Sequence, residues 1–220
     1  MVRLFSYTIP IDDGAAPNPF GGMISLAICK PGIRRAAKEQ DWIAGLGSKK
    51  AKIGDLSGKL VYAMRVQEVL SLREYDLQAA SRWPHRIPRP TSADLSQRLG
   101  DCIYDYSGGS DPSQRPGVHG RTNRETDLSG KNVLISRDFY YFGSQAIDLP
   151  KHLDKIRHQT QGHKSKANDP YVAQFETWIR GLGFPPGQHG WPDFIVDWDS
   201  ITSCGGCPIR KADDESDIPC

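Results

Sequence analysis

The sequence lacks a strong charge of either sign. Its 220 residues include 28 basic and 26 acidic side chains, which gives a formal net charge of +2. Proteins that attract nucleic acid by overall charge are far more basic, so this balance excludes recognition by bulk electrostatics. Any anion-binding surface must come from local clusters of Lys and Arg.

Long hydrophobic runs are also missing. No apolar stretch approaches the roughly 20 residues that cross a bilayer. Polar residues interrupt the apolar ones in the first segment, MVRLFSYTIPIDDG, where a signal peptide would have an unbroken apolar core. We therefore predict a cytoplasmic protein that makes no membrane contacts.

Cysteine is sparse and odd in number, with five residues, which argues against a secreted disulfide framework. Cys204 and Cys207 have the spacing of a metal knuckle, but only Cys220 follows them. A zinc site, a redox dithiol and a plain polar tail over residues 202–220 are the alternatives, and the tail is favoured. We predict no metal site and no cofactor, since no glycine-rich cofactor fingerprint is present either.

The length suits one domain of moderate size. We predict a single α+β domain over residues 1–201, with a loop-rich insertion over residues 81–130 that is rich in Pro and Gly. The segment SRWPHRIPRP within it is the most basic in the chain. It suits a strand-tracking arm for nucleic acid or an ordinary exposed insertion, and the sequence does not separate the two.

Most of the chain shows local signals for secondary structure: apolar alternation for strands, and capping residues or proline at helix starts. The clearest succession lies between Pro31 and Tyr75. It comprises a helix (Gly32–Gln40), a buried strand (Asp41–Ser48), a basic connection (Lys49–Gly58), an alternating strand (Lys59–Val69) and a capping box (Ser71–Glu74). The other predicted strands are Arg3–Ile11, Met23–Cys29, Cys102–Tyr106, a buried strand that starts at Val133–Ile135 within the stretch Lys131–Gly143, and Trp191–Ile201. Helices are predicted over Asp148–Gln159 and after Asn168.

Several segments carry a family resemblance. The runs CKPGIRRAAKEQDWIAGLGSKK and GKLVYAMRVQEVL, and later NVLISRDFYYFG, GHKS and GWPDFIV, resemble the second type of nucleotide modification-associated domain of bacteria and phages. The likeness covers most of residues 1–200. One departure is Gln40, where the family usually has glycine, and we expect it to alter the turn into the following strand.

The order helix, strand, loop, strand is more distantly similar to the PUA-like barrels, which include EVE, YTH and ASCH domains. That resemblance implies a PUA-like mixed β-barrel or sheet with flanking helices. It also implies binding of RNA or of modified bases.

Aromatic side chains are the first group of candidate site residues. Trp42 and Tyr62 lie on the two central predicted strands, and Tyr140 and Tyr141 lie in a block of four consecutive aromatics. Four neighbours cannot all face one core, so some must meet solvent, a second layer or a ligand. We predict a pocket between Trp42/Tyr62 and Tyr140/Tyr141 in which a base stacks, although each ring also suits a core.

Polar side chains form the second group. Asn18, between two prolines, suits an ordered turn or contact with the edge of a base. Lys30 and Arg34 flank the first helix start, where cations favour phosphate, and Ser48 ends a strand that contains two glycines. The resemblance adds His158, His163 and Lys164.

We therefore predict binding of a nucleotide, or of a modified base in nucleic acid, within a DNA or RNA base-modification or phage-defence system. One alternative is an enzyme acting on a nucleotide, with His158 or His163 in proton transfer and Asp41 or Asp138 orienting it. The sequence shows no spaced nucleophile and base, so no catalytic residue is identified. The other alternative is a module that binds protein partners from such a system.

Overall fold

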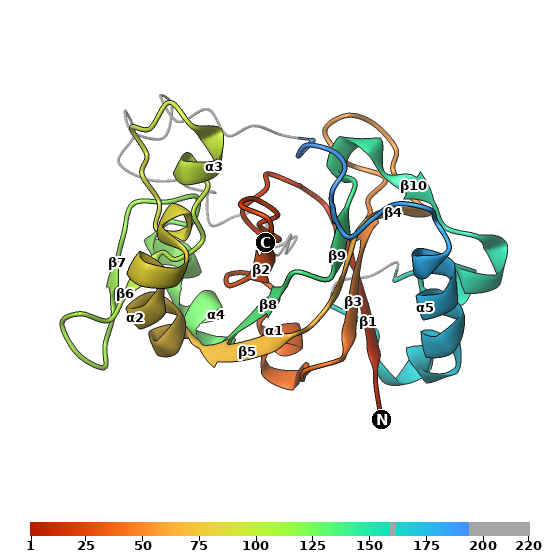
Figure 1. Ribbon diagram of the computed structural model, residues 1–220, viewed down its shortest axis with the longest axis horizontal. Coiled ribbons are helices and arrows are strands. Elements are labelled where there is room, and N and C mark those ends of the chain that lie inside the picture. Colours follow the sequence, from red (N-terminus) through yellow and green to blue (C-terminus); the bar gives the residue numbers. More distant parts are fainter. Residues whose placement is uncertain (159–161, 194–220) are drawn as a thin grey trace, which may run out of the picture.

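The chain is a mixed α+β protein, described by a computed structural model for residues 1–158 and 162–193 (Figure 1). Its strands form a large sheet, a three-stranded sheet and a short two-stranded ribbon. The strands are β1 (Leu4–Ile9), β2 (Ile24–Leu26), β3 (Trp42–Gly47), β4 (Lys59–Arg65), β5 (Glu68–Ser71), β6 (Tyr104–Asp105), β7 (Ser113–Gln114), β8 (Asn132–Ser136), β9 (Phe139–Tyr141), β10 (Ile147–Asp148) and β11 (Gly187–Gln188).

Helices cover both outer sides of these sheets. The α-helices are α1 (Pro31–Ala36), α2 (Leu72–Arg82), α3 (Leu95–Arg98), α4 (Arg124–Ser129) and α5 (Val172–Arg180). The 3-10 helices are η1 (Pro84–Arg86), η2 (Arg121–Asn123), η3 (Gly143–Gln145), η4 (Lys151–Ile156) and η5 (Lys166–Tyr171). Figure 1 shows α5 beside the large sheet, with α2, α3 and α4 grouped at the opposite end of the molecule.

The large sheet has the strand order β1-β3-β4-β9-β11, with β10 paired to β4, and the three-stranded sheet has the order β2-β8-β5. One face of the large sheet packs on the smaller sheet and α1, and the other packs on η4 and α5. The smaller sheet also contacts α2 through a further core. These layers explain why β3 is buried along its whole length.

Local signals in the sequence were sufficient to predict several elements of the N-terminal half. The predicted strands of β1 and β3 are confirmed, and the helix predicted over Gly32–Gln40 is present but shorter, as α1 over Pro31–Ala36. The capping box is confirmed as well, because the Ser71 hydroxyl accepts a hydrogen bond from the Glu74 N–H and the Glu74 carboxylate accepts one from Ser71 N–H. Gln40 has φ 73°, the left-handed conformation that glycine favours, so the turn keeps a glycine-like backbone despite the substitution.

One predicted long strand is wrong, because it divides between the two sheets, whereas the strand start predicted at Val133–Ile135 is confirmed within β8. The strand predicted over Lys59–Val69 ends as β4 at Arg65 and resumes as β5 at Glu68. The segment Lys131–Gly143 divides in the same way into β8 and β9. In the described part of the chain the strands form separate sheets and no closed barrel, so the barrel part of the prediction is not confirmed.

Residues 81–130 contain short helices and part of a hydrophobic core. Trp83 is buried and contacts Tyr75 with ring centroids 5.6 Å apart. Arg86 is fully buried and donates hydrogen bonds to the carbonyls of Asn18, Phe20 and Met23. Trp83 and Arg86 of the SRWPHRIPRP segment are therefore packed into the protein, and a nucleic-acid role for its exposed Arg82 and Arg89 stays a prediction.

The C-terminal part differs from prediction in two places. The helix predicted over Asp148–Gln159 is the shorter 3-10 helix η4, although its apolar residues are buried as expected. Asn168 does not cap a helix: it is buried, and its amide donates to the Leu4 carbonyl and the Ser6 hydroxyl. Most of the predicted strand Trp191–Ile201, and Cys204, Cys207 and Cys220, lie outside the described residues.

Candidate functional site

The four predicted rings lie on two opposite faces of the large sheet. Tyr62 pairs with Tyr141 across β4 and β9 and shares a core with it, whereas Trp42 and Tyr140 belong to the core on the other face. All four are at most 2% exposed. Because neighbouring residues in a strand alternate in direction, these rings do not form one cleft, and the second layer of packing accommodates the aromatic block.

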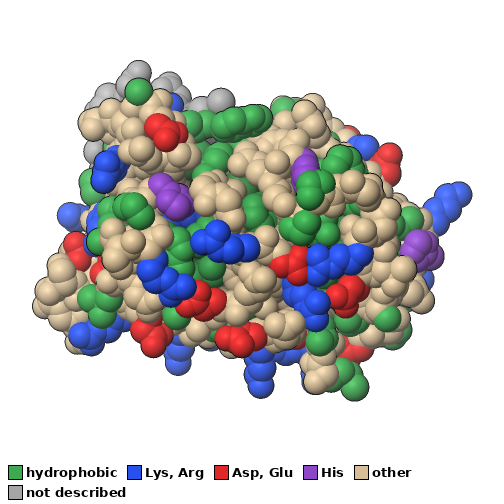
Figure 2. All heavy atoms as spheres, in the orientation of Figure 1, with side chains coloured by type: hydrophobic (Ala, Val, Ile, Leu, Met, Phe, Trp, Pro, Cys, Tyr) green, Lys and Arg blue, Asp and Glu red, His purple; other side chains and the backbone are tan. Residues whose placement is uncertain are grey.

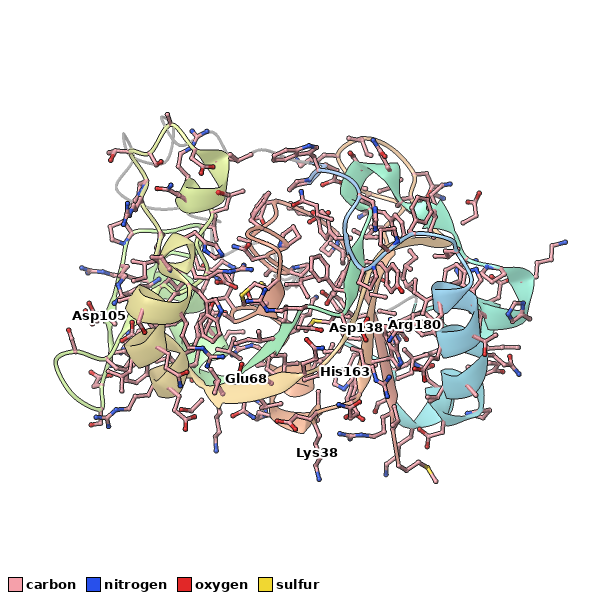
Figure 3. The ribbon with its side chains drawn as sticks, viewed as in Figure 1. Lys38, Glu68, Asp105, Asp138, His163 and Arg180 are labelled. Atoms are coloured by element: carbon pink, nitrogen blue, oxygen red, sulfur yellow. The ribbon has the colours of Figure 1, made fainter. Side chains whose placement is uncertain are left out.

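On the face of Trp42, an arginine covers the rings. Trp42 meets Phe175 edge to face, with centroids 5.7 Å apart, and the Arg180 guanidinium lies 5.0 Å from the Trp42 ring centroid. Arg180 donates to both carboxylate oxygens of Asp138, each at 2.5 Å, and the two side chains lie next to each other in Figure 3. Trp42 thus lies under a bidentate ion pair.

Replacing Arg180 with methionine should lower the free energy of unfolding by about 1–2 kcal/mol, because a bidentate ion pair and a cation–π contact are lost together at a partly exposed position. Chemical denaturation measures this change. The control is Arg137→Met, which changes an exposed arginine next to Asp138. Equal effects of the two substitutions would contradict the role of the Asp138–Arg180 pair.

On the sheet face that carries Tyr62, tyrosine side chains and a carboxylate form a buried polar cluster. The Tyr62 and Tyr7 hydroxyls are 2.9 Å apart, and the Tyr141 hydroxyl donates to Asp12 at 2.7 Å. Burial raises the pKa of Asp12 from 3.8 to about 7. Lys30 lies on the same face, with its ammonium 4.8 Å from the centroid of the Tyr7 ring.

His163 and Lys164 belong to a segment that covers the edge of the large sheet. The Lys164 backbone exchanges hydrogen bonds with Ser6 of β1, and its ammonium donates to the Lys155 carbonyl. His163 packs on Phe5, with ring centroids 5.7 Å apart. Burial, His158 and Lys30 together lower the pKa of His163, so this side chain is in a cationic neighbourhood.

Arg34 and Asn18 are enclosed by protein. Arg34 is 0% exposed, and its guanidinium donates to the carbonyls of Cys29, Asp127 and Asn132. The Asn18 amide donates to the Leu99 carbonyl, and its side-chain oxygen accepts from the Phe20 N–H. Asn18 thus has the contacts of the ordered-turn alternative, and the ligand roles predicted for both residues stay predictions.

The two carboxylates considered for an enzyme have other partners. Asp41 forms a salt bridge with Arg3 at 2.9 Å and accepts the backbone N–H of Arg3 and of Lys38. Asp138 is engaged by Arg180. Neither carboxylate orients His158 or His163 through the hydrogen bonds of the described residues.

Ser48 and His158 meet in a cleft of about 400 Å³. The cleft lies between the β3–β4 loop and the segment after η4. We call it the cationic cleft, because Lys49, Lys50 and Arg157 line it together with Ser48 and His158. The other lining residues are Thr8, Leu46, Gly47, Ser57 and Gly58.

Glycine and backbone hydrogen bonds shape this cleft. A side chain on Gly47 would overlap the backbone of Leu56, so only glycine lets the β3–β4 loop fold back on the strand end. The Leu56 N–H then donates to the Ser48 carbonyl at 3.0 Å. On the other wall, the Thr8 hydroxyl donates to the His158 carbonyl at 2.5 Å, which fixes this segment against β1.

The charge of the cationic cleft is positive. Three cations line it, and the acidic groups nearby are Asp55 in the loop and Asp154, whose carboxylate lies 3.9 Å from Arg157 Nη1. Hydrogen bonds from Ser57 lower the pKa of Asp55, with smaller contributions from Lys49 and Arg157. On the face of the molecule shown in Figure 2, by contrast, basic and acidic side chains lie side by side. The cleft is thus a local cluster of cations in a nearly neutral protein.

Arg157 is the cation of this cleft that the sequence did not indicate. Lys49 and Lys50 were recognised as part of a basic connection, but 107 positions separate Lys50 from Arg157. Its only local signal was its position next to His158. The cluster arises because η4 returns the chain to the end of β3.

Within the described residues, no three or more His, Cys, Asp or Glu side chains are grouped as metal ligands would be. No helix there has the length and apolar character needed to cross a bilayer.

Comparison with curated proteins gives no match, and comparison with solved structures gives none. A family model does match, and it is described as nucleotide modification associated domain 2. The match covers residues 1–199 and therefore includes the described parts of both sheets. The chain belongs to the nucleotide modification associated domain 2 family.

Proposed function

We propose that this domain binds a nucleotide, free or within nucleic acid, through its phosphate groups in the cationic cleft. The observation that carries the proposal is the convergence of Lys49, Lys50 and Arg157 on one cleft with Ser48 and His158. Its volume of about 400 Å³ lies within the range of ordinary ligand pockets. Membership of a family associated with nucleotide modification supports a nucleotide as the anion.

The residues that line the cleft suggest how the ligand is held. Arg157 offers planar, bidentate donors and the two lysines offer compact charges, which is a suitable combination for phosphate oxygens. The Ser48 hydroxyl adds a neutral hydrogen-bonding group. The described residues that line the cleft include no Phe, Tyr or Trp, so affinity in this proposal comes from the phosphates and not from stacking of the base.

Recognition of a modified base and a place in a base-modification or phage-defence system belong to the same proposal, and a module that binds protein partners stays the alternative to it. The relation to PUA-like barrels also belongs to the proposal, and it is supported by two segments that pass from one sheet to the other. The segments β4–β5 and β8–β9 run side by side, and the Gln67 N–H donates to the Ile135 carbonyl where they cross.

Charge reversal in the cleft tests the proposal. Nucleoside mono-, di- and triphosphates and short oligonucleotides are titrated into the protein and the dissociation constants are measured. Lys50→Glu and Arg157→Glu should each weaken binding by about tenfold or more, since each replaces a phosphate contact with repulsion. Affinity should also fall as salt is raised.

The matched control is Lys38→Glu, which makes the same charge change at an exposed lysine after α1 that points away from the protein in Figure 3. It should leave the affinity within about twofold, because exposed charges beyond about 10 Å are screened at moderate salt. Equal losses in all three variants, or no binding of any of these ligands, would contradict the proposal.

A further inference from the structure

We propose that Cys29, His119 and Asp127 form a catalytic triad for acyl transfer at an amide or ester carbonyl of an anionic substrate. The Cys29 sulfur lies 3.4 Å from His119 Nε2, and His119 Nδ1 lies 2.6 Å from an Asp127 carboxylate oxygen. A nucleophile, a base and a group that orients the base thus follow one another in hydrogen-bonding distance, which is the arrangement of activated nucleophiles. This site is separate from the cationic cleft.

The carboxylate determines which nitrogen of His119 carries the proton. Asp127 Oδ2 accepts from His119 Nδ1 and from the Tyr104 hydroxyl at 3.0 Å, and its Oδ1 accepts the Cys29 N–H at 2.9 Å. With the proton on Nδ1, the lone pair of Nε2 points at the thiol. His119 is therefore oriented to take the thiol proton.

The backbone of the Cys29 turn is held in an unusual conformation. Cys29 and Lys30, between β2 and α1, have φ of 59° and 39° in succession, a region that side-chain-bearing residues rarely adopt. Arg34 stabilises this turn, because its guanidinium donates to the carbonyl of Cys29 and to that of Asp127. The same arginine thus joins the nucleophile's turn to the helix that carries the acid.

A metal site does not fit these three residues. Cys29 and Asp127 lie on opposite edges of the His119 ring, at Nε2 and Nδ1, so their donor atoms do not converge on one point. Burial fits the triad: Asp127 is fully buried, while Cys29 is 5% and His119 9% exposed. Within this group, only Cys29 and His119 keep a small exposed fraction.

The neighbours of Cys29 indicate the charge of the substrate. The ammonium of Lys30, the next residue, lies over the Tyr7 ring, and a side chain on Gly32 would lie 3.1 Å from the His163 ring. A cation and a histidine therefore border the turn. Thr8 lines the cationic cleft, whereas its strand neighbour Tyr7 is beneath Lys30, so the two sites lie on opposite faces of β1.

The reaction balances with water as the only co-reactant. The Cys29 sulfur attacks the carbonyl carbon and His119 takes its proton. His119 then returns that proton to the departing amine or alcohol, which leaves a thioester on Cys29. His119 then takes a proton from water, the resulting hydroxide attacks the thioester carbonyl and releases a carboxylic acid, and His119 returns the proton to the Cys29 sulfur.

Alkylation of the 220-residue chain by iodoacetamide tests the proposal without a known substrate. The rate at each cysteine is followed by peptide-resolved mass spectrometry at about pH 6.5, well below the ordinary thiol pKa of about 8.5. Cys29 should react about tenfold or more faster in the folded protein than in the urea-unfolded chain. Cys102 is the internal control: burial raises the pKa of its thiol, so it should react more slowly when folded.

His119→Gln separates activation from simple exposure. In this variant the rate at Cys29 should fall about tenfold or more, to that of the unfolded chain. If the variant does not fold, the wild-type comparison still decides. As a second measurement, p-nitrophenyl acetate should release one equivalent of p-nitrophenol in a burst and leave an acetyl group on Cys29, and Cys29→Ala should abolish this burst. Slower alkylation of Cys29 in the folded state than in urea, or an unchanged rate in His119→Gln, would show a structural cluster and overturn the proposal.

Discussion

Replacing Arg86 with methionine is expected to lower the free energy of unfolding by about 3–6 kcal/mol. The buried guanidinium donates to three carbonyls, at 2.7 to 3.0 Å. Methionine fills a similar volume but removes a donor from each carbonyl. Among the described residues only the Asn18 carbonyl keeps another donor, the Ser25 N–H, and each buried acceptor left without a donor costs about 1–3 kcal/mol. The total free energy of unfolding of a domain is about 5–15 kcal/mol, so the variant should unfold partly at physiological temperature.

The control for this prediction is Arg89→Met, at an exposed arginine in the same segment. Urea denaturation, followed by circular dichroism, should show a change within about 0.5 kcal/mol for this surface position. If the Arg86 variant is as stable as the Arg89 variant, the buried arginine does not hold the loop at residues 18–23 as described.

Replacing Asp12 with asparagine should stabilise the protein at neutral and alkaline pH and change it little in acid. The pKa of Asp12 rises from 3.8 to about 7 because the carboxylate is buried. Between these values the folded protein keeps a proton that the unfolded chain has released. Stability therefore falls as pH rises through this window, by about 1.4 kcal/mol for each unit and about 4 kcal/mol in full.

Asparagine cannot ionise, so the variant should not show this loss. The quantity to measure is the difference in free energy of unfolding between variant and wild type at several values from about pH 4 to pH 8, since subtraction removes most of the contribution of other groups, such as Asp193. The difference should grow in favour of the variant as pH rises. Parallel stability curves would refute the assignment to Asp12.

The sequence predicted elements wherever a local rule determined them. Pro31 begins α1, Ser71 and Glu74 cap α2, and the apolar run of β3 is buried. The division between β4 and β5 has no such signal. The alternating pattern continues through this division. The chain changes direction because the Val66 N–H donates to the Asp41 carbonyl and the Gln67 N–H donates to the Ile135 carbonyl. A contact with a distant partner replaces the local preference there.

Charged residues were the hardest to place from the sequence. Arginine is usually exposed, so nothing local indicated that Arg34 and Arg86 would be buried donors to carbonyls. Ser48 and His158 were predicted as site residues and do share a cleft, whereas Arg157 became visible only in the structure. Cys29 and His119 are 90 positions apart, and only the fold brings them together.

Hydrogen–deuterium exchange with and without nucleotide tests the central claim most directly, because it maps the site without any substitution. When a nucleotide is added and binds, backbone amides in residues 47–58 and next to Arg157 should exchange more slowly, since these segments form the cationic cleft. Protection confined to another region, such as the second cavity lined by His152, Gln174 and Trp178, would contradict the account.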